Sequence, residues 1–206
     1  MINNVIFDWS GVVSDDFAIV YEACMHTFDR FNAPRISIEK ARREFEIPYM
    51  NFWHRYFPDL TKEEQDSIYV NALNQLESAQ IYHGMKQVLG SFYTRKIKMA
   101  VLSTHPHLKL EQEARSYGIN KLFLELKGSV ANKTEDIHSM MERHNFLPYD
   151  TAFVGDMNHD VETGKSAGIR TIAVTWGYYD KQRLAKANPD MIIDSPSDLE
   201  HAILTP

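Results

Sequence analysis

The chain has 206 residues, of which 44% are hydrophobic and 12% aromatic, the composition of an ordinary globular protein. Its formal net charge of −6 gives no overall attraction for nucleic acid or an anionic membrane surface, so neither is expected as a partner. A single cysteine excludes an intramolecular disulfide, and no apolar run reaches the ~20 residues that span a bilayer. The first apolar segment is a short strand ending in an acid, not a signal peptide, so we expect a cytoplasmic protein.

The chain opens with a short apolar run, Val5-Ile6-Phe7, which ends in Asp8 and leads into a turn containing Gly11. This pattern is typical of a buried strand that presents a carboxylate at its carboxyl end, where open α/β sheets place their chemistry. A second example occurs near the other end of the chain, where residues 151–155 lead to Asp156. Two strands that each end in an acid predict a site for a hard cation, because hard cations prefer oxygen ligands.

Residues 15–81 differ from the rest of the sequence, because they carry helical patterns and no convincing strand. Thr61 and Glu64 have the spacing of a capping box, in which each side chain bonds the other residue's backbone N–H at the start of a helix. We therefore predict a helical cap domain over residues 15–81, inserted into a core domain that comprises residues 1–14 and 82–206.

From residue 84 onward the sequence alternates between helical and strand patterns. Helices are expected over residues 85–93, from Pro106 in the first turn of the next, and over 133–144, 158–167, 181–187 and 197–204. Strands are expected over residues 97–102, within 122–130, and over 151–154, 170–175 and 191–193. This alternation predicts an α/β fold with a doubly wound, mostly parallel, Rossmann-like sheet. The N-terminal strand belongs to the same sheet, which places the helical cap after the first strand.

Polar residues follow the predicted strands in a fixed order: Asp8, Ser103, Lys133, and then Asp156 with Asp160. This order, with the helical insertion, resembles the haloacid dehalogenase superfamily over essentially the whole chain. The motifs of that family are Asp-x-Asp-Gly-[Thr/Val], a Ser or Thr closing an apolar strand, a Lys ahead of a helix, and Gly-Asp-x-x-x-Asp. The chain departs from them at one position, because Ser10 replaces the second Asp of the first motif. Residues 167–178 resemble phosphoglycolate phosphatases in particular.

The resemblance implies that Asp8 is a nucleophile that forms an aspartyl-phosphate with a small phosphorylated substrate. It also implies a Mg²⁺ ion held by the Asp8 carboxylate, the Ser10 backbone carbonyl and Asp156, which offsets charge as two anions approach. Asp160 is expected to orient these groups and not to bind the ion itself.

The same resemblance assigns the recognition of the phosphoryl group to two loops. Lys133 would supply a fixed ammonium group close to Asp8 and to the phosphoryl oxygens, and the Ser103 hydroxyl would bind those oxygens with neighbouring amides. Ser103 and Lys133 are thus both catalytic and substrate-binding in this interpretation, and Thr104, the next residue in the loop, is a further substrate-binding candidate.

Ser10 fits the expected fold but not the expected catalytic activity. In phosphatases of this family the Asp at this position protonates the leaving oxygen and then activates water, which a Ser hydroxyl cannot do near neutral pH. Loss of a general acid/base costs ~10²–10⁴ in rate, so the site should bind Mg²⁺ and phosphate but turn over slowly unless another group substitutes. The candidates for that group are Asp15, Asp16, His54 and His105.

Three functions fit these residues. The first, which we adopt, is a Mg²⁺-dependent phosphohydrolase of the phosphoglycolate phosphatase type. The second is a non-phosphatase hydrolase of the same fold, such as a phosphonoacetaldehyde hydrolase, which has Asp-Trp-Ala-Gly in place of Asp8-Trp9-Ser10-Gly11 and needs a Schiff-base lysine in its cap. Lys40 and Lys62 are the available lysines, and we expect both to be solvated. The third is a non-catalytic phosphate-binding or regulatory protein.

Overall fold

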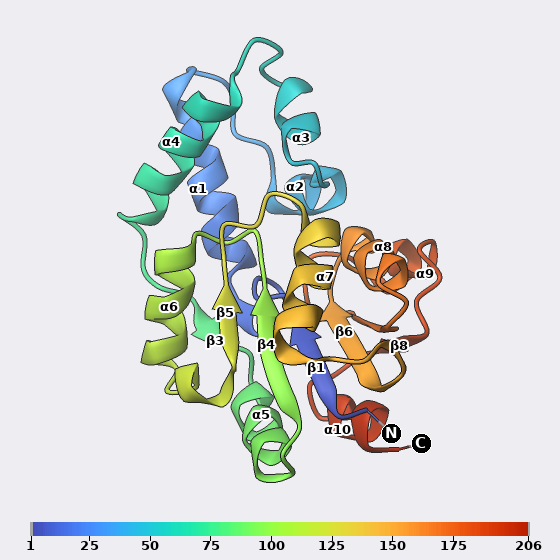
Figure 1. Ribbon diagram of the computed structural model, residues 1–206. Helices are drawn as coiled ribbons and strands as arrows, with labels where there is room; N and C mark the ends of the chain where they lie inside the picture. Colours follow the sequence, from blue (N-terminus) through green and yellow to red (C-terminus); the bar gives the residue numbers. More distant parts are fainter. Residues whose placement is uncertain (1, 206) are drawn as a thin grey trace. The chain divides into compact units, whose positions relative to one another are not determined.

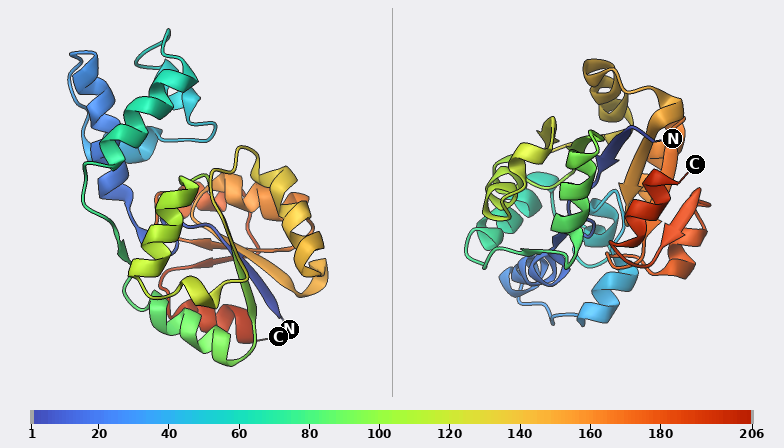
Figure 2. Two further views of the ribbon diagram at one scale, coloured as in Figure 1. Left: turned by 60° about the vertical axis from the view of Figure 1, so that its left-hand side comes forward. Right: turned by 90° about the horizontal axis from the view of Figure 1, so that it is seen from below.

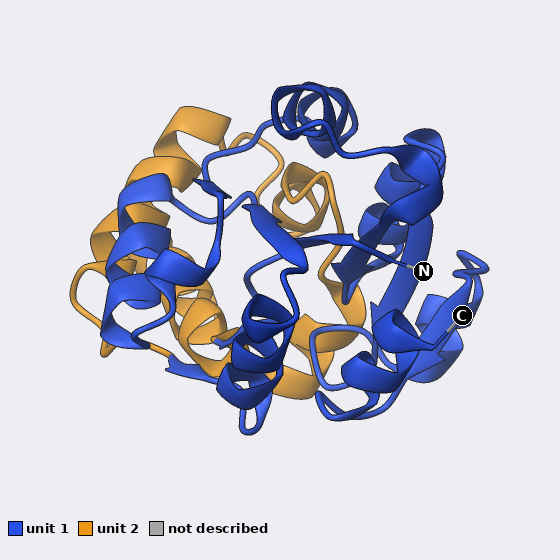
Figure 3. Ribbon diagram, turned by 60° about the horizontal axis from the view of Figure 1, so that its bottom comes forward, with its two compact units in different colours: residues 1–15, 80–206 blue, residues 16–79 orange. Residues whose placement is uncertain are grey.

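A computed structural model describes residues 2–205 of the chain. These residues form two compact units (Figure 3). Unit 1 contains the chain up to Asp15 and from Gln80 onward, and unit 2 contains Asp16–Ala79.

Unit 1 is built on a six-stranded sheet in the order β5-β4-β1-β6-β7-β8 (Figure 1). Every neighbouring pair in this sheet is parallel. The strands are β1 (Asn4–Phe7), β4 (Lys98–Leu102), β5 (Glu125–Lys127), β6 (Thr151–Gly155), β7 (Arg170–Val174) and β8 (Met191–Ile193). The predicted α/β fold with a Rossmann-like parallel sheet is confirmed.

Helices cover both faces of this sheet (Figure 2). Val5 and Phe7 of β1 pack in one core cluster with Leu89, Leu110 and Leu199, whereas Ile6 packs in another with Ile137. Successive side chains of a strand point to opposite faces, so a strand covered on both sides reads as a continuous apolar run. The helices of unit 1 are α5 (Met85–Thr94), α6 (His107–Ser116), α7 (Lys133–His144), α8 (Asn158–Ser166), α9 (Lys181–Ala185) and α10 (Asp198–Leu204), with the 3₁₀ turns η1 (Asn120–Leu122) and η2 (Pro148–Asp150).

Two details of unit 1 differ from the prediction. Pro106 lies at the N-cap position before α6 and not in its first turn. A second sheet pairs β2 (Ser14–Asp15) with β3 (Gln80–Ile81) in antiparallel fashion, at the two points where the chain leaves and re-enters unit 1. These strands have two residues each, too few for a periodic pattern to show in the sequence.

Unit 2 consists of helices, namely α1 (Phe17–Arg30), α2 (Ile38–Glu44), α3 (Met50–His54) and α4 (Lys62–Leu73). The predicted capping box of Thr61 and Glu64 is present at the start of α4. The ring centroids of Trp53 and Tyr56 lie 6.1 and 5.0 Å from the ring centroid of Phe28. These contacts give unit 2 an aromatic core of its own. None of the helices over residues 2–205 is both long and apolar enough to cross a bilayer.

Candidate active site

Three neighbouring strands of the parallel sheet end in polar residues at the same edge. Asp8 follows β1, Ser103 follows β4 and Asp156 follows β6, and β1 pairs with both of the other strands. Asp8 is 6% exposed, and Ser103 and Asp156 are 1% exposed. Buried carboxylates are costly unless cations or hydrogen-bond donors compensate them, so their partners define the site.

Lys133 supplies the ammonium group of this site. It is the first residue of α7, and its Nζ lies 2.7 Å from Asp8 Oδ2 and 2.7 Å from Asp160 Oδ1. Burial by itself would lower the pKa of Lys133, but the charges and hydrogen bonds of Asp160 and Asp8 outweigh it and raise that pKa. Lys133 therefore carries a positive charge held in place between two carboxylates.

Asp160 is occupied on both of its carboxylate oxygens. One oxygen contacts Lys133, and the other accepts hydrogen bonds from the backbone N–H groups of Asp156 and Met157, at 3.2 and 3.0 Å. Those N–H groups lie where β6 gives way to α8, so the side chain of Asp160 fixes the turn that carries Asp156.

The three buried acids lie close together, with one carboxylate oxygen from each of Asp8, Asp156 and Asp160 within 4.8 Å of the others. Burial raises the pKa of Asp8, and it raises that of Asp156 well above its ordinary value with further help from the charges of Asp160 and Asp8. Lys133 compensates only part of this negative charge. A set of buried carboxylate oxygens with excess charge fits a hard divalent cation such as Mg²⁺.

Two glycines leave the space that the Asp156 carboxylate fills. A Cβ atom added to Gly11 would lie 2.1 Å from Asp156 Oδ2, and one added to Gly177 would lie 2.3 Å from the same atom. The backbone N–H of Tyr178 donates to this oxygen at 2.6 Å. The turn after Asp8 and the segment after β7 together hold Asp156 in one orientation.

This packing predicts that Gly11→Ala lowers the free energy of unfolding more than an Ala substitution at a glycine with the same backbone conformation. Gly168 has a φ of +67° against +73° for Gly11, but an added Cβ there meets nothing within 4 Å. Gly168→Ala should cost about 1–2 kcal/mol of unfolding free energy for the left-handed backbone. Gly11→Ala should cost about 1–3 kcal/mol more because of the clash with Asp156. Urea unfolding of both variants measures the difference, and equal losses would contradict the packing argument.

A second buried polar cluster begins at Ser10. The Ser10 hydroxyl oxygen lies 3.4 Å from His105 Nδ1, and His105 Nε2 lies 3.5 Å from Glu113 Oε1. The other oxygen of Glu113 accepts a 2.7 Å hydrogen bond from the indole N–H of Trp9. Burial would raise the pKa of Glu113, but the contacts with His105 and Trp9 outweigh it and lower that pKa, so Glu113 is an anion.

Three further residues were candidates to replace the missing acid, and the structure gives each of them its own surroundings. Asp15 is exposed in β2, Asp16 is the N-cap residue of α1, and His54 Nε2 lies 3.1 Å from the Leu60 carbonyl oxygen. His105 is thus the candidate that the structure brings into contact with Ser10.

The loop that follows β4 is fixed by the loop that follows β5. The Val130 N–H donates to the Ser103 carbonyl at 3.1 Å, and the Ser129 N–H donates to the His105 carbonyl at 2.7 Å. The Ser103 hydroxyl accepts a 3.2 Å hydrogen bond from the His105 N–H, and Thr104 between them is exposed. Ser103 is therefore held at the strand end beside Asp8, whereas the structure shows Thr104 only as an exposed neighbour.

Glu113 and the Tyr178 N–H are parts of the site that sequence reasoning missed. Glu113 did have a signal, because it falls with Leu110 and Ala114 on the buried face of α6, and a carboxylate within an apolar stripe needs a partner. The Tyr178 N–H had none, since every residue other than proline carries a backbone N–H.

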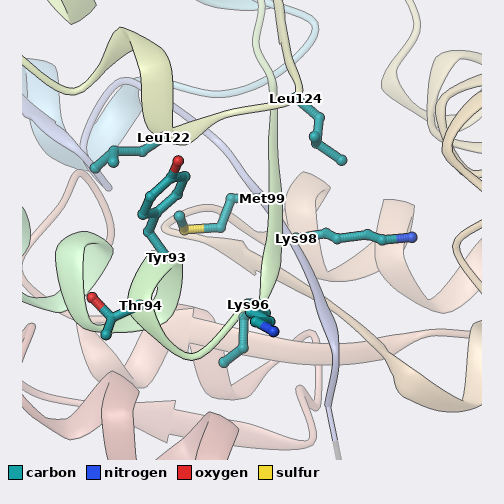
Figure 4. Close-up of a pocket in the computed structure, with 8 residues that line it drawn as sticks. Tyr93, Thr94, Lys96, Lys98, Met99, Leu122 and Leu124 are labelled. Atoms are coloured by element: carbon teal, nitrogen blue, oxygen red, sulfur yellow. The ribbon is translucent and has the colours of Figure 1, made fainter.

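A cavity of about 500 Å³ lies away from these residues, at the start of β4 and not at its end (Figure 4). It is lined by Tyr93, Thr94, Lys96, Ile97, Lys98, Met99, Leu122 and Leu124. These side chains include no carboxylate, so the cavity lacks the acidic oxygens that cluster around Asp8 and Asp156.

The model of the haloacid dehalogenase-like hydrolase family matches residues 5–174. The chain belongs to this family. The predicted family and the predicted hydrolase class are therefore confirmed.

Among curated relatives of this family member, a phosphoglycolate phosphatase of Synechococcus elongatus is 28% identical over 130 residues, which cover 62% of this chain and 61% of the relative. The match thus spans about three fifths of the length of that relative. The pyrophosphatase PpaX of Halalkalibacterium halodurans is 22% identical and is matched over 96% of this chain and 95% of its own.

Solved structures of the family share the fold at low sequence identity. A haloacid dehalogenase-like hydrolase from Streptococcus pneumoniae superimposes with a TM-score of 0.86 at 21% identity, covering 98% of both chains. CbbY from Rhodobacter sphaeroides, solved as a mutant in complex with xylulose-1,5-bisphosphate, has a TM-score of 0.78 at 18% identity, covering 97% of this chain and 96% of its own.

Proposed function

We propose that this family member is a Mg²⁺-dependent phosphohydrolase that acts on a small phosphorylated metabolite through an aspartyl-phosphate on Asp8. One observation carries this proposal: the buried Asp8 carboxylate lies at a strand end within an acidic cluster and is held by Lys133 at 2.7 Å. A carboxylate can attack phosphorus only if cations offset the repulsion between two anions, and this site supplies one cation and fits a second.

In this proposal the residues around Asp8 orient the nucleophile and bind the phosphoryl group. Asp8 Oδ1 accepts a 2.7 Å hydrogen bond from the Trp9 N–H, and Oδ2 contacts Lys133, so the nucleophile is oriented before substrate binds. Lys133 also stabilises the charge on the phosphoryl oxygens, and the Ser103 hydroxyl binds them.

Mg²⁺ would be held by the Asp8 carboxylate, the Ser10 backbone carbonyl and Asp156, and it would supply charge neutralisation as the two anions approach. Asp160 would orient the site, because its oxygens already bond Lys133 and the backbone around Asp156.

The substrate is proposed to be a small phosphate ester or anhydride, the class to which phosphoglycolate and pyrophosphate both belong. The relatives named for these two compounds support that class. We propose that unit 2, which contains Asp16–Ala79, is a cap domain that contributes substrate choice, because the groups placed around Asp8 in unit 1 recognise only the phosphoryl end.

The lysines of unit 2 disfavour a Schiff-base reaction. Such a lysine must lose its proton, which requires a lowered pKa. The hydrogen bonds of Asp66 and Tyr49 instead raise the pKa of Lys62. Lys40 lies 3.8 Å from Glu44 with 45% of its side chain exposed, a solvated helix-surface pair.

The proposed function is tested by measuring phosphate release from a panel that includes phosphoglycolate, pyrophosphate, sugar phosphates and 4-nitrophenyl phosphate. The expected result is Mg²⁺-dependent turnover that a chelator removes. Phosphonoacetaldehyde belongs in the panel, because its cleavage in place of monoester hydrolysis would favour the Schiff-base alternative. Binding of phosphate without hydrolysis of any compound would identify a phosphate-binding protein instead.

The metal site makes a separate prediction about stability. Mg²⁺ at about 100 times its dissociation constant should stabilise the folded protein by about 2.7 kcal/mol, because the ion binds the folded acidic cluster and not the unfolded chain. Asp156→Asn should remove most of this gain. Thermal unfolding with Mg²⁺ and with a chelator measures it, and Asp136→Asn on the surface of α7 is the control that should keep it. An equal Mg²⁺ shift in Asp156→Asn would contradict the assigned ligand.

A further inference from the structure

Position 10 lacks the carboxylate that the proposed phosphatase chemistry needs, but Ser10 is not isolated. Its hydroxyl oxygen lies 3.4 Å from Nδ1 of His105, a residue that is 6% exposed. Ser10 follows Asp8 by two positions in the chain. An imidazole is the side chain best suited to exchange a proton near neutral pH.

The other ring nitrogen of His105 faces a buried anion. His105 Nε2 makes no hydrogen bond to any described residue, and Glu113 Oε1 lies 3.5 Å from it, with both side chains 3% exposed. A carboxylate behind an imidazole fixes the orientation of the ring and stabilises the positive charge that the ring gains when it takes up a proton.

Both ends of this arrangement are held in place. The Trp9 indole N–H donates to Glu113 Oε2 at 2.7 Å, and the Trp9 ring stacks on the Tyr117 ring with centroids 5.8 Å apart. The backbone of His105 donates to the Ser103 hydroxyl and accepts from the Ser129 N–H. The imidazole is therefore positioned by the core of unit 1 and not by a mobile surface loop.

We propose that Ser10, His105 and Glu113 form a proton relay that replaces the missing carboxylate at position 10. This proposal rests on the phosphatase function proposed above. It assigns the acid/base work to a serine, a histidine and a glutamate in series, with Glu113 as the positioning residue that remains an anion throughout.

In the first step a carboxylate oxygen of Asp8 forms a bond to phosphorus, and the bond from phosphorus to the ester oxygen breaks with its electron pair on that oxygen. The ester oxygen takes the hydroxyl proton of Ser10, which takes a proton from His105 Nδ1. In the second step water attacks the phosphorus of the aspartyl-phosphate, and Asp8 leaves with its electron pair. The water proton passes to Ser10, whose own proton returns to His105, so the relay ends as it began.

A purely structural role for His105, as a packed partner of Glu113, makes a different prediction from the relay. Loss of packing lowers the amount of active protein and affects all substrates alike. Loss of a proton donor affects most strongly those esters whose leaving oxygen needs a proton, and spares those that leave as stable anions.

The test compares wild type and His105→Gln on 4-nitrophenyl, phenyl and alkyl phosphates in the presence of Mg²⁺. We expect kcat/KM for alkyl phosphates to fall by about 10²-fold or more in His105→Gln, and kcat/KM for 4-nitrophenyl phosphate by less than about tenfold. Glu113→Gln should show a smaller change in the same direction. His107→Gln is the matched control, because His107 is 46% exposed beside Glu111 and should leave the leaving-group dependence unchanged.

A rapid-mixing experiment examines the second step. His105→Gln should release about one equivalent of 4-nitrophenolate in a burst and then slow, because the aspartyl-phosphate forms but is hydrolysed slowly. Adding Ser10→Asp to His105→Gln should restore turnover by supplying the carboxylate directly. Partial unfolding would reduce the burst amplitude without creating either effect.

The outcomes separate the two proposals. If His105→Gln lowers kcat/KM equally for all esters, or leaves it unchanged, the relay is wrong while the phosphatase function stands. If Ser10→Asp fails to restore turnover in the His105→Gln background, the relay is also wrong. If the wild type hydrolyses no ester and Asp8 is never phosphorylated, the proposed function fails and the relay fails with it.

Discussion

Asp8→Asn is expected to reduce phosphate-ester turnover by at least about 10⁴-fold, because the amide cannot act as the nucleophile that forms the phosphoryl-enzyme. The change keeps the size of the side chain and its hydrogen bond from the Trp9 N–H at 2.7 Å, so the fold should survive. Steady-state hydrolysis of 4-nitrophenyl phosphate measures the loss. A second measurement incubates the protein with a substrate labelled in its phosphate and then quenches it with acid. The wild type should retain labelled phosphate, and Asp8→Asn should retain none.

The control for this variant is Asp136→Asn. Asp136 lies on α7, the helix that begins with Lys133, and it pairs with Lys127 of β5. Both of these side chains are more than a quarter exposed. It should retain wild-type turnover and labelling. Residual activity of Asp8→Asn above a tenth of the wild type would remove Asp8 from the role of nucleophile.

Lys133→Met is expected to destabilise the metal-free protein by about 3–5 kcal/mol, because it leaves buried carboxylates without their ammonium partner. Lys133 is 4% exposed and lies 2.7 Å from both Asp8 and Asp160, so water cannot replace it readily. Urea unfolding in the presence of a chelator measures this loss. Adding Asp160→Asn should recover part of it, since one of the unpaired charges is then removed.

Lys127→Met provides the comparison for Lys133→Met. The Lys127–Asp136 pair has the same chemistry, but its side chains are 29% and 27% exposed. Removal of such a partly exposed pair should cost at most about 1 kcal/mol. If the two lysine variants lose the same stability, the charges around Asp8 are better solvated than the structure indicates.

The order of the longer elements was readable from the sequence because these elements have strong local patterns. The helix predicted over residues 133–144 and the strand predicted over 191–193 coincide with α7 and β8. The central strands β1, β4 and β6 are largely apolar on both faces. The helices α2, α4, α7 and α9 begin with a capping side chain. The pairing of β2 with β3 was not readable, because it joins two-residue segments that are 65 positions apart (80 − 15).

The sequence by itself determined the family and the residues that follow its strands, since strand–acid and Lys–helix motifs are local and come in a fixed order. It also showed that Ser10 stands where the family motif has an acidic residue. Only the tertiary structure decided what lies beside Ser10, because His105 and Glu113 are 95 and 103 residues further along the chain (105 − 10 and 113 − 10). Contacts of this kind depend on how β1, β4 and α6 pack, and no spacing rule connects such distant positions.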